Sequence, residues 1–296
     1  MSEKPHPTAP CPFSIDIPGG RTGVLLLHGL SGTPNEMRSL AEHLGKAGHT
    51  VSCPLLAGHC GSYDDLKQST WQDWAASAEA ALARLRAKCD LIVVGGLSTG
   101  AILSLLLAAR HPDGVHGVIP LAPTLWLNGW MIPKHAHLFR LVLQKPVANM
   151  FDFPDMFPHG VKDEAIRAEV KAAIDSGDSS IAGLPVTPGG AVIEHRWLVQ
   201  TVIKQLRHIA QPTLIIAPRE DDYADMNNVA YLQRHLAGIV DTVILNDSYH
   251  IITVDRQRHI VNERSATFID RLRSEAAPSV VNERTDTAAP TLTLIG

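Results

Sequence analysis

Short apolar runs alternate with amphipathic helical patterns along most of this chain. Residues 23–27 form an apolar run of the kind found in strands buried on both faces of a parallel sheet. Met37, Leu40 and Leu44 then follow at helical spacing, so one face of the next segment is apolar. An apolar strand followed by an amphipathic helix is the repeating unit of a parallel sheet. The pattern therefore predicts an α/β fold.

A helix-start signal separates these first two segments. Thr33, Pro34 and Glu36 match the N-cap, the first helical position and the third helical position of a capping box. In such a box the two polar side chains accept hydrogen bonds from main-chain N–H groups that a helix start leaves free. The first helix is therefore expected to begin just after Thr33.

The same alternation continues towards the end of the chain. We predict further strands at residues 50–53, 91–95, 118–121, 213–217 and 242–245, and further helices at residues 70–88, 99–110, 229–236 and 256–272. Strands that alternate with helices in this way indicate a mostly parallel, doubly wound sheet.

One long segment interrupts the alternation. Residues 124–210 contain no clear strand and are rich in aliphatic and aromatic side chains, which predicts an inserted helical cap with a return helix. The core domain is then expected to consist of residues 21–123 and 211–273. Residues 1–20 form an N-terminal segment, and residues 274–296, rich in Ala, Pro, Thr and Ser, form a C-terminal tail.

Composition and charge exclude several classes of protein. The chain has 296 residues, of which 45% are apolar, so it can bury a full hydrophobic core. Lys plus Arg number 26 and Asp plus Glu number 30, which leaves a net charge of −4. Because these charges are scattered along the chain, neither nucleic acid nor an acidic membrane surface is expected as the main partner.

The cysteines and the apolar stretches indicate the cellular compartment of the protein. The longest strongly apolar stretch, residues 101–109, is too short to span a membrane, and residues 1–13 lack the apolar region of a signal peptide. The four cysteines contain no C-x-x-C pair and are too few to cross-link a chain of this length. We therefore expect reduced thiols in a cytoplasmic protein without a transmembrane segment.

A G-x-S-x-G motif lies where a nucleophilic serine would be expected. Gly96, Ser98 and Gly100 stand between the predicted strand at 91–95 and the predicted helix at 99–110. A sharp strand-to-helix turn exposes such a serine, and the two glycines leave room for its strained main chain. Ser98 is therefore the candidate nucleophile.

A serine needs a base, and the base needs a group that fixes its tautomer. His250 follows the predicted strand at 242–245, and an acidic loop follows the strand at 213–217. In that loop we favour Asp221 as the acid and keep Asp222 as the alternative. Both loops follow the carboxyl ends of strands, where open α/β sheets bind ligands.

The remaining catalytic requirement is a pair of hydrogen-bond donors for an oxyanion. The main-chain N–H of Thr99, directly after the nucleophile, and that of Leu30, in the loop after the first strand, are the candidates. The lone H-x-H at His135 and His137 is weak evidence for a metal site. Because the chain also lacks phosphate-binding and dinucleotide-binding motifs, no metal and no cofactor are expected.

These motifs together resemble the α/β-hydrolase superfamily, and most closely its small bacterial carboxylesterases and monoacylglycerol lipases. The resemblance covers residues 20–122 and 211–272 and rests on His28-Gly29, Gly58-His59, Gly96-Leu97-Ser98-Thr99-Gly100, the Asp221 loop and His250-Ile251-Ile252-Thr253. It implies a capped α/β-hydrolase fold and a serine esterase with the triad Ser98, Asp221 and His250. The chain departs from the family pattern at Tyr249, where glycine is usual, and in its Glu-Asp-Asp run, which leaves the acid open.

The expected function is two-step acyl transfer from an ester to water. Trp126, Trp130, Phe139 and Tyr249 are the candidate substrate-binding residues, because an apolar lining favours a hydrocarbon chain. We therefore expect a small-molecule ester as the partner, of medium-chain neutral or monoacylglycerol-like type. The same triad would also serve a thioesterase, an acyltransferase or a C–C bond hydrolase, and a non-catalytic ligand-binding module is the alternative of another class. The oligomeric state is left open.

Overall fold

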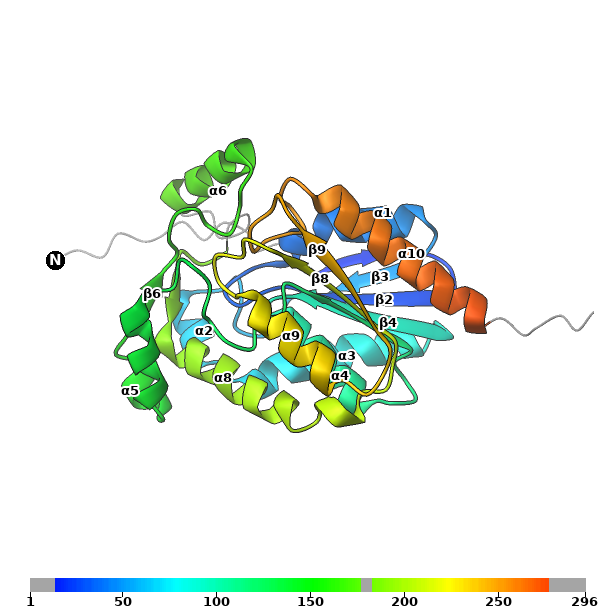
Figure 1. Ribbon diagram of the computed structural model, residues 1–296, viewed down its shortest axis with the longest axis horizontal. Helices are drawn as coiled ribbons and strands as arrows, with labels where there is room; N and C mark the ends of the chain where they lie inside the picture. Colours follow the sequence, from blue (N-terminus) through cyan, green and yellow to red (C-terminus); the bar gives the residue numbers. More distant parts are fainter. Residues whose placement is uncertain (1–13, 177–182, 277–296) are drawn as a thin grey trace, which may run out of the picture.

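The computed structural model describes residues 14–176 and 183–276, which build a sheet covered by helices on both faces (Figure 1). Seven strands lie in the order β1-β3-β2-β4-β5-β8-β9, and all neighbours are parallel except β1 and β3. The strands are β1 (Ile15–Ile17), β2 (Thr22–Leu27), β3 (Thr50–Cys53), β4 (Leu91–Leu97), β5 (Gly117–Leu121), β8 (Thr213–Pro218) and β9 (Val240–Leu245). The predicted mostly parallel α/β fold is therefore confirmed.

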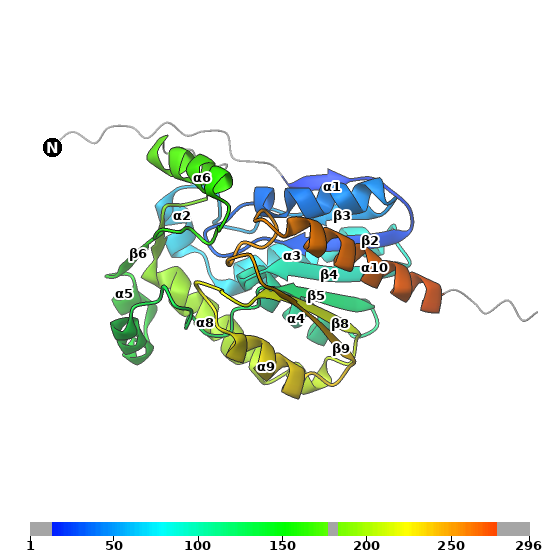
Figure 2. The same cartoon turned by 45° about the horizontal axis from the view of Figure 1, so that its top comes forward.

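Two helical layers enclose the sheet. The main helices are α1 (Arg38–Lys46), α3 (Trp71–Arg86), α4 (Thr99–Arg110), α8 (Gly189–Ile203), α9 (Met226–His235) and α10 (Arg258–Ala276). Along β2, Val24 and Leu26 join the hydrophobic cluster formed with α1 and α10, whereas Leu25 and Leu27 join the cluster formed with α3, α4, α8 and α9. Figure 2 shows α1 and α10 together on one side of the sheet. This alternation explains why β2 is apolar at four consecutive positions, from Val24 to Leu27.

Three local features differ from the sequence-based expectation. Strand β1 pairs with β3 at the edge of the sheet, and the short helix α2 (Tyr63–Gln68) precedes α3; neither was predicted. Three residues and six residues are too short for a periodic pattern to stand out. The predicted first helix begins with a 3₁₀ turn, η1 (Pro34–Met37), whose N-cap is Thr33 as expected.

The predicted cap contains several elements before its return helix. They are the 3₁₀ turn η2 (Lys134–Leu141), α5 (Lys145–Ala148), β6 (Asp152–Pro154), α6 (Glu164–Ser176) and β7 (Val186–Pro188). Strands β6 and β7 pair as a small antiparallel sheet, which the sequence did not predict. The return helix α8 packs in the layer of α3 and α4. The sequence-based domain boundaries stay predictions. Of the tail, residues 274–276 belong to α10 and the rest lies outside the described residues.

The cysteines require one correction. Cys53 and Cys89 are free and buried, but Cys60 is disulfide-bonded, so the expectation that all four are reduced thiols is wrong. Sequence spacing shows only C-x-x-C pairs directly, whereas a disulfide depends on contacts between distant segments. The cytoplasmic location therefore stays a prediction without this support. None of the helices in residues 14–176 and 183–276 has the length and apolar character of a membrane span.

Candidate active site

Ser98 lies in the tight turn between β4 and α4. Its main chain has φ of 56° and ψ of −112°, a conformation that is strained for a residue with a side chain. A Cβ atom at Gly100 would lie 2.1 Å from the carbonyl oxygen of Leu27, and one at Gly96 would lie 2.4 Å from the carbonyl carbon of Gly100. Only glycine fits at both positions, so the close packing of β2, β4 and α4 holds Ser98 in the strained turn.

His250 and Asp221 are in direct contact. They follow β9 and β8, and the Nδ1 atom of His250 lies 2.9 Å from both carboxylate oxygens of Asp221. The main-chain N–H groups of Tyr223 and Ala224 also donate to Asp221 Oδ1, each at 2.8 Å, and so fix the carboxylate. Because a carboxylate only accepts, the ring proton lies on Nδ1 and the lone pair on Nε2. This is the tautomer that a general base requires.

The hydroxyl of Ser98 has a partner that the sequence analysis missed. Its Oγ atom lies 3.2 Å from the Oγ1 atom of Thr124, whose own hydroxyl donates to the carbonyl of Ala122. Ser98 is therefore the donor to Thr124, and within the described residues no hydrogen bond joins Ser98 to His250. Catalytic hydrogen bonds often form only with bound substrate. The position of Thr124 just after β5, at the carboxyl end of a strand, was the available sequence signal.

The two candidate oxyanion donors come from two segments next to Ser98, the start of α4 and the loop after β2. Thr99 is the first residue of α4, so its N–H has no partner within the helix. In the loop after β2, the N–H of Gly29 donates to Glu36 and the N–H of Gly32 donates to the carbonyl of Gly29. These bonds shape the loop without using the N–H of Leu30. An added Cβ at Gly29 would lie 3.6 Å from the Cβ of Ser98, so the loop passes directly beside the candidate nucleophile.

The charges around His250 are unusual for a buried site. Burial disfavours the charged imidazole, but Asp221 and Asp222 outweigh it and raise the pKa of His250. Burial raises the pKa of Asp222 to about 6 and that of Glu36 to about 7. Burial lowers the pKa of His195 to about 4; its Nδ1 atom lies 3.0 Å from the Thr99 hydroxyl. Perturbed titratable groups around His250 mark this region as a functional-site candidate.

His28 belongs to the support behind the site. It is fully buried, and burial lowers its pKa to about 3, so the ring is neutral. The N–H of Leu56 donates to its Nε2 atom at 3.1 Å, and its Nδ1 atom lies 2.9 Å from the carbonyl oxygen of Gly29. The ring therefore ties the loop after β2 to the segment after β3.

The four aromatic residues predicted to bind substrate lie in three separate contacts. Trp130 packs edge-on against Tyr249 at 5.6 Å between ring centroids, next to His250. Trp126 packs against Tyr231 at 5.0 Å, and Phe139 packs against other phenylalanines of the cap. Their role in substrate binding stays a prediction.

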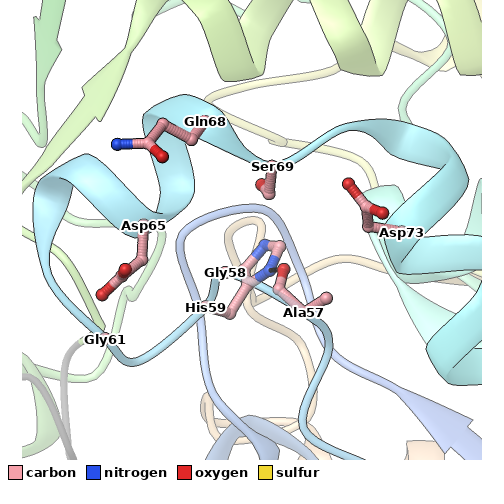
Figure 3. Close-up of a pocket in the computed structure, with 8 residues that line it drawn as sticks. All are labelled: Ala57, Gly58, His59, Gly61, Asp65, Gln68, Ser69 and Asp73. Atoms are coloured by element: carbon pink, nitrogen blue, oxygen red, sulfur yellow. Dashed lines mark hydrogen bonds between the residues drawn. The ribbon is translucent and has the colours of Figure 1, made fainter.

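A hollow on the described surface lies elsewhere, between the segment after β3 and helices α2 and α3 (Figure 3). It measures about 490 Å³ and includes His59, Asp65 and Asp73 in its lining. Asp65 and Asp73 are the third residues of the capping boxes that start α2 and α3. These carboxylates therefore serve helix ends, and the hollow contains no residue of the candidate triad. In the part of the chain that is described, no three His, Cys, Asp or Glu side chains gather as a metal site requires.

Comparison with known proteins places this geometry in a family. The model of the α/β hydrolase fold family matches residues 23–257 of the chain. The chain belongs to this family, as the motifs around Ser98 and His250 predicted.

Relatives and solved structures agree with this assignment. A thermostable monoacylglycerol lipase from Bacillus sp. (strain H-257) is 30% identical over 258 residues, which cover 84% of this chain and 90% of the relative. A carboxylesterase from Bacillus subtilis (strain 168) is 24% identical over 267 residues, which cover 89% of this chain and 97% of the relative. A solved structure of the metagenome-derived lipolytic enzymes LipS and LipT is similar, with a TM-score of 0.76 and 28% identity, covering 88% of this chain and 98% of that one.

Proposed function

We propose that this chain is a serine hydrolase that cleaves carboxylic esters, with Ser98 as nucleophile, His250 as general base and Asp221 as the orienting acid. The observation that carries the proposal is the arrangement at the carboxyl ends of the strands. A strained serine directly precedes α4, and a buried imidazole is held by a carboxylate in the tautomer that leaves Nε2 free to accept a proton. The lipase and carboxylesterase relatives support the same activity.

The acylation step begins when the Ser98 hydroxyl turns from Thr124 towards Nε2 of His250. His250 takes the proton while the Ser98 oxygen attacks the ester carbonyl carbon, and the carbonyl oxygen becomes an oxyanion. The N–H groups of Leu30 and Thr99 hold this oxyanion. His250 then gives its proton to the departing alcohol, the bond from carbon to that alcohol breaks, and an acyl-enzyme remains.

Deacylation repeats the same proton transfers with water. His250 accepts a proton from a water molecule whose oxygen attacks the acyl carbon, and a second oxyanion forms between the N–H groups of Leu30 and Thr99. The proton returns to the oxygen of Ser98, which leaves, and the carboxylic acid is released. Asp221 stays ionised and stabilises the imidazolium in both steps.

We propose neutral esters of medium chain length, including monoacylglycerol-like esters, as the substrate class. Three observations support this class: the apolar side chains of the cap, the Trp130–Tyr249 pair beside His250, and the relative that is a monoacylglycerol lipase. Burial of hydrocarbon contributes about 25 cal/mol per Å². Each additional methylene that the site covers should therefore increase kcat/KM until the pocket is filled.

The test is hydrolysis of a series of p-nitrophenyl esters from acetate to palmitate, with Ser98→Ala as the control. We expect kcat/KM to rise to a maximum at medium chain length and Ser98→Ala to reduce turnover by several orders of magnitude. Full activity in Ser98→Ala would contradict the proposed nucleophile. A maximum at acetate, or a requirement for a charged acyl group, would contradict the substrate class and leave the serine hydrolase assignment intact.

A further inference from the structure

Three consecutive residues after β8 each contact His250 in a different way. Asp221 accepts the hydrogen bond from its imidazole, and the ring of Tyr223 lies against the imidazole at 5.0 Å between centroids. Asp222, between them, contacts the main chain of His250 instead of the ring. The acidic loop therefore determines both the orientation of the imidazole and the position of the backbone that carries it.

The carboxylate of Asp222 joins two segments that are far apart in the sequence. It is fully buried; Oδ1 accepts the N–H of His250 at 3.1 Å, and Oδ2 accepts the N–H of Gly160 at 3.0 Å. His250 belongs to the loop after β9, whereas Gly160 precedes α6 in the predicted cap. Each oxygen thus holds one of the two main chains.

Gly160 is also packed against the histidine loop directly. Its carbonyl oxygen accepts the N–H of Ile251 at 2.8 Å, and its φ of +69° is one that glycine tolerates. A Cβ atom at this position would lie 2.8 Å from Cγ1 of Ile251 and 3.5 Å from the Cβ of His250. A second link comes from Tyr223, whose hydroxyl donates to Asp155 at 2.8 Å.

We propose that Asp222 is a positioning residue of the hydrolytic site: its buried carboxylate clamps the backbone of His250 to the backbone of Gly160 and so holds the base in register with the cap. This inference rests on the proposed function, and it assigns Asp222 a role distinct from that of Asp221. Burying an ionisable carboxylate is costly unless it is hydrogen-bonded. Asp222 offsets this cost through the two N–H groups, and its ionised form places a second negative charge beside the imidazole.

Asp222 has an electrostatic effect on His250 that a purely structural residue would not have. The charged and titratable groups that act on His250 come from three elements: Asp221 and Asp222 from the acidic loop, Glu36 from η1, and His195 from α8. Asp222 stabilises the imidazolium and so raises the pKa of His250. Because the base must be neutral to act, the acidic limb of kcat/KM reports this pKa. Removing the charge at Asp222 should move that limb to lower pH.

The chain offers a matched control at Asp255. This residue is also fully buried, and its carboxylate accepts the N–H groups of Tyr249 at 2.7 Å, Lys162 at 3.0 Å and Asp163 at 2.8 Å. It therefore joins the same two segments of main chain. It is not among the groups that shift the pKa of His250. Asp255→Asn should loosen the fold without moving the acidic limb.

The experiment measures kcat and kcat/KM between pH 5 and pH 9 for the wild type, Asp222→Asn and Asp255→Asn, with a medium-chain p-nitrophenyl ester. We expect Asp222→Asn to lower kcat at least tenfold and to move the acidic limb to lower pH, while Asp255→Asn leaves the limb at the wild-type position. The proposal is overturned if Asp222→Asn keeps the wild-type kcat or limb, or if Asp255→Asn moves the limb equally. An inactive, folded wild type would instead count against the proposed function itself.

A second variant covers the case in which Asp222→Asn does not fold. Gly160→Ala presses a methyl group against Ile251 at the other end of the clamp and changes no charge. We expect its kcat to fall while its acidic limb stays at the wild-type pH. A wild-type kcat in folded Gly160→Ala would overturn the proposal.

Discussion

The carboxylate of Glu36 accepts a hydrogen bond from the main-chain N–H of Gly29 at 2.9 Å. The sequence pattern assigned Glu36 to a capping box with Thr33, but the structure directs its Oε2 atom to the loop that carries Leu30. The same side chain lies above Gly32, where an added Cβ would lie 2.0 Å from Oε1. Glu36 therefore shapes the loop that offers one of the two proposed oxyanion donors.

Glu36→Ala should impair catalysis through this loop. Without the acceptor, the N–H of Gly29 loses its partner and Leu30 is no longer held beside Ser98. Loss of one oxyanion donor typically reduces kcat by about 10²–10³-fold, and we expect a loss approaching the lower figure. Glu36→Gln keeps a carbonyl acceptor and should retain most of the activity. Steady-state kinetics of both variants at pH 7.5 provide the measurement; equal kcat values for the two would argue against this role.

Asp221→Asn should lower kcat far more than the same change at a neighbouring carboxylate. The substitution allows the side-chain amide to donate to Nδ1 of His250, which stabilises the wrong tautomer, and the expected loss in kcat is about 10⁴-fold. Asp225→Asn is the control, because the Asp225 carboxylate caps α9 through the N–H of Asn227 and otherwise accepts only from the side-chain amides of Asn227 and Asn228 within the described residues. It should stay within a few-fold of the wild type. A loss under tenfold in Asp221→Asn would shift the acid role away from this residue.

Adding a methyl group at Gly100 should destabilise the fold more than adding one at Gly48. Gly100→Ala would place a Cβ 2.1 Å from the carbonyl oxygen of Leu27, where neither main chain can move freely, and we expect at least about 3 kcal/mol of destabilisation. Gly48→Ala has open space and only a positive φ of +90°, which costs about 1–2 kcal/mol. Chemical denaturation of both variants measures the difference. Equal stabilities would show that the turn can relax around the added atom.

Acid should destabilise the folded protein through its buried histidines. Burial lowers the pKa of His28 to about 3 and those of His59 and His195 to about 4. Between pH 6.5 and pH 4 the unfolded chain binds these protons and the folded chain does not, so stability falls as the pH falls. Each histidine contributes roughly 1.4 kcal/mol per pH unit in that window. Glu36 and Asp222, whose pKa values burial raises to about 7 and about 6, act in the opposite direction in this window, but the three histidines outnumber them. Tm measured from pH 7 to pH 4.5 should therefore decline, and less steeply in His59→Gln; identical slopes would exclude His59 as a cause.

Periodicity predicted the features that depend on burial. The strands β2, β4, β5 and β8 are buried at every position because both of their faces are covered. Their apolar runs, and the shorter run Val243-Ile244-Leu245 at the end of β9, can be recognised without a structure. Ser98, Asp221 and His250 follow three of these strands. Since the carboxyl ends of parallel strands meet at one edge, sequence position alone was enough to select them as candidates.

Contacts between distant segments could not be predicted in the same way. The clamp from Asp222 to Gly160 joins residues 62 positions apart, and the contact of Ser98 with Thr124 depends on the path taken after β5. Nothing in the local pattern distinguishes Asp222 from Asp221, because both are acidic residues at the end of β8. The paired strands β6 and β7 have three residues each, too few for alternation to be recognised.

The central claim, that His250 activates the hydroxyl of Ser98, is tested most directly by covalent labelling with a fluorophosphonate. The phosphorus atom takes the place of the acyl carbon, and only an activated serine displaces fluoride from it at a useful rate. We expect one adduct per chain by intact mass, mapped to Ser98 by peptide sequencing, absent in Ser98→Ala and strongly slowed in His250→Gln. An adduct that persists on folded Ser98→Ala, or labelling of His250→Gln at the wild-type rate, would contradict the claim.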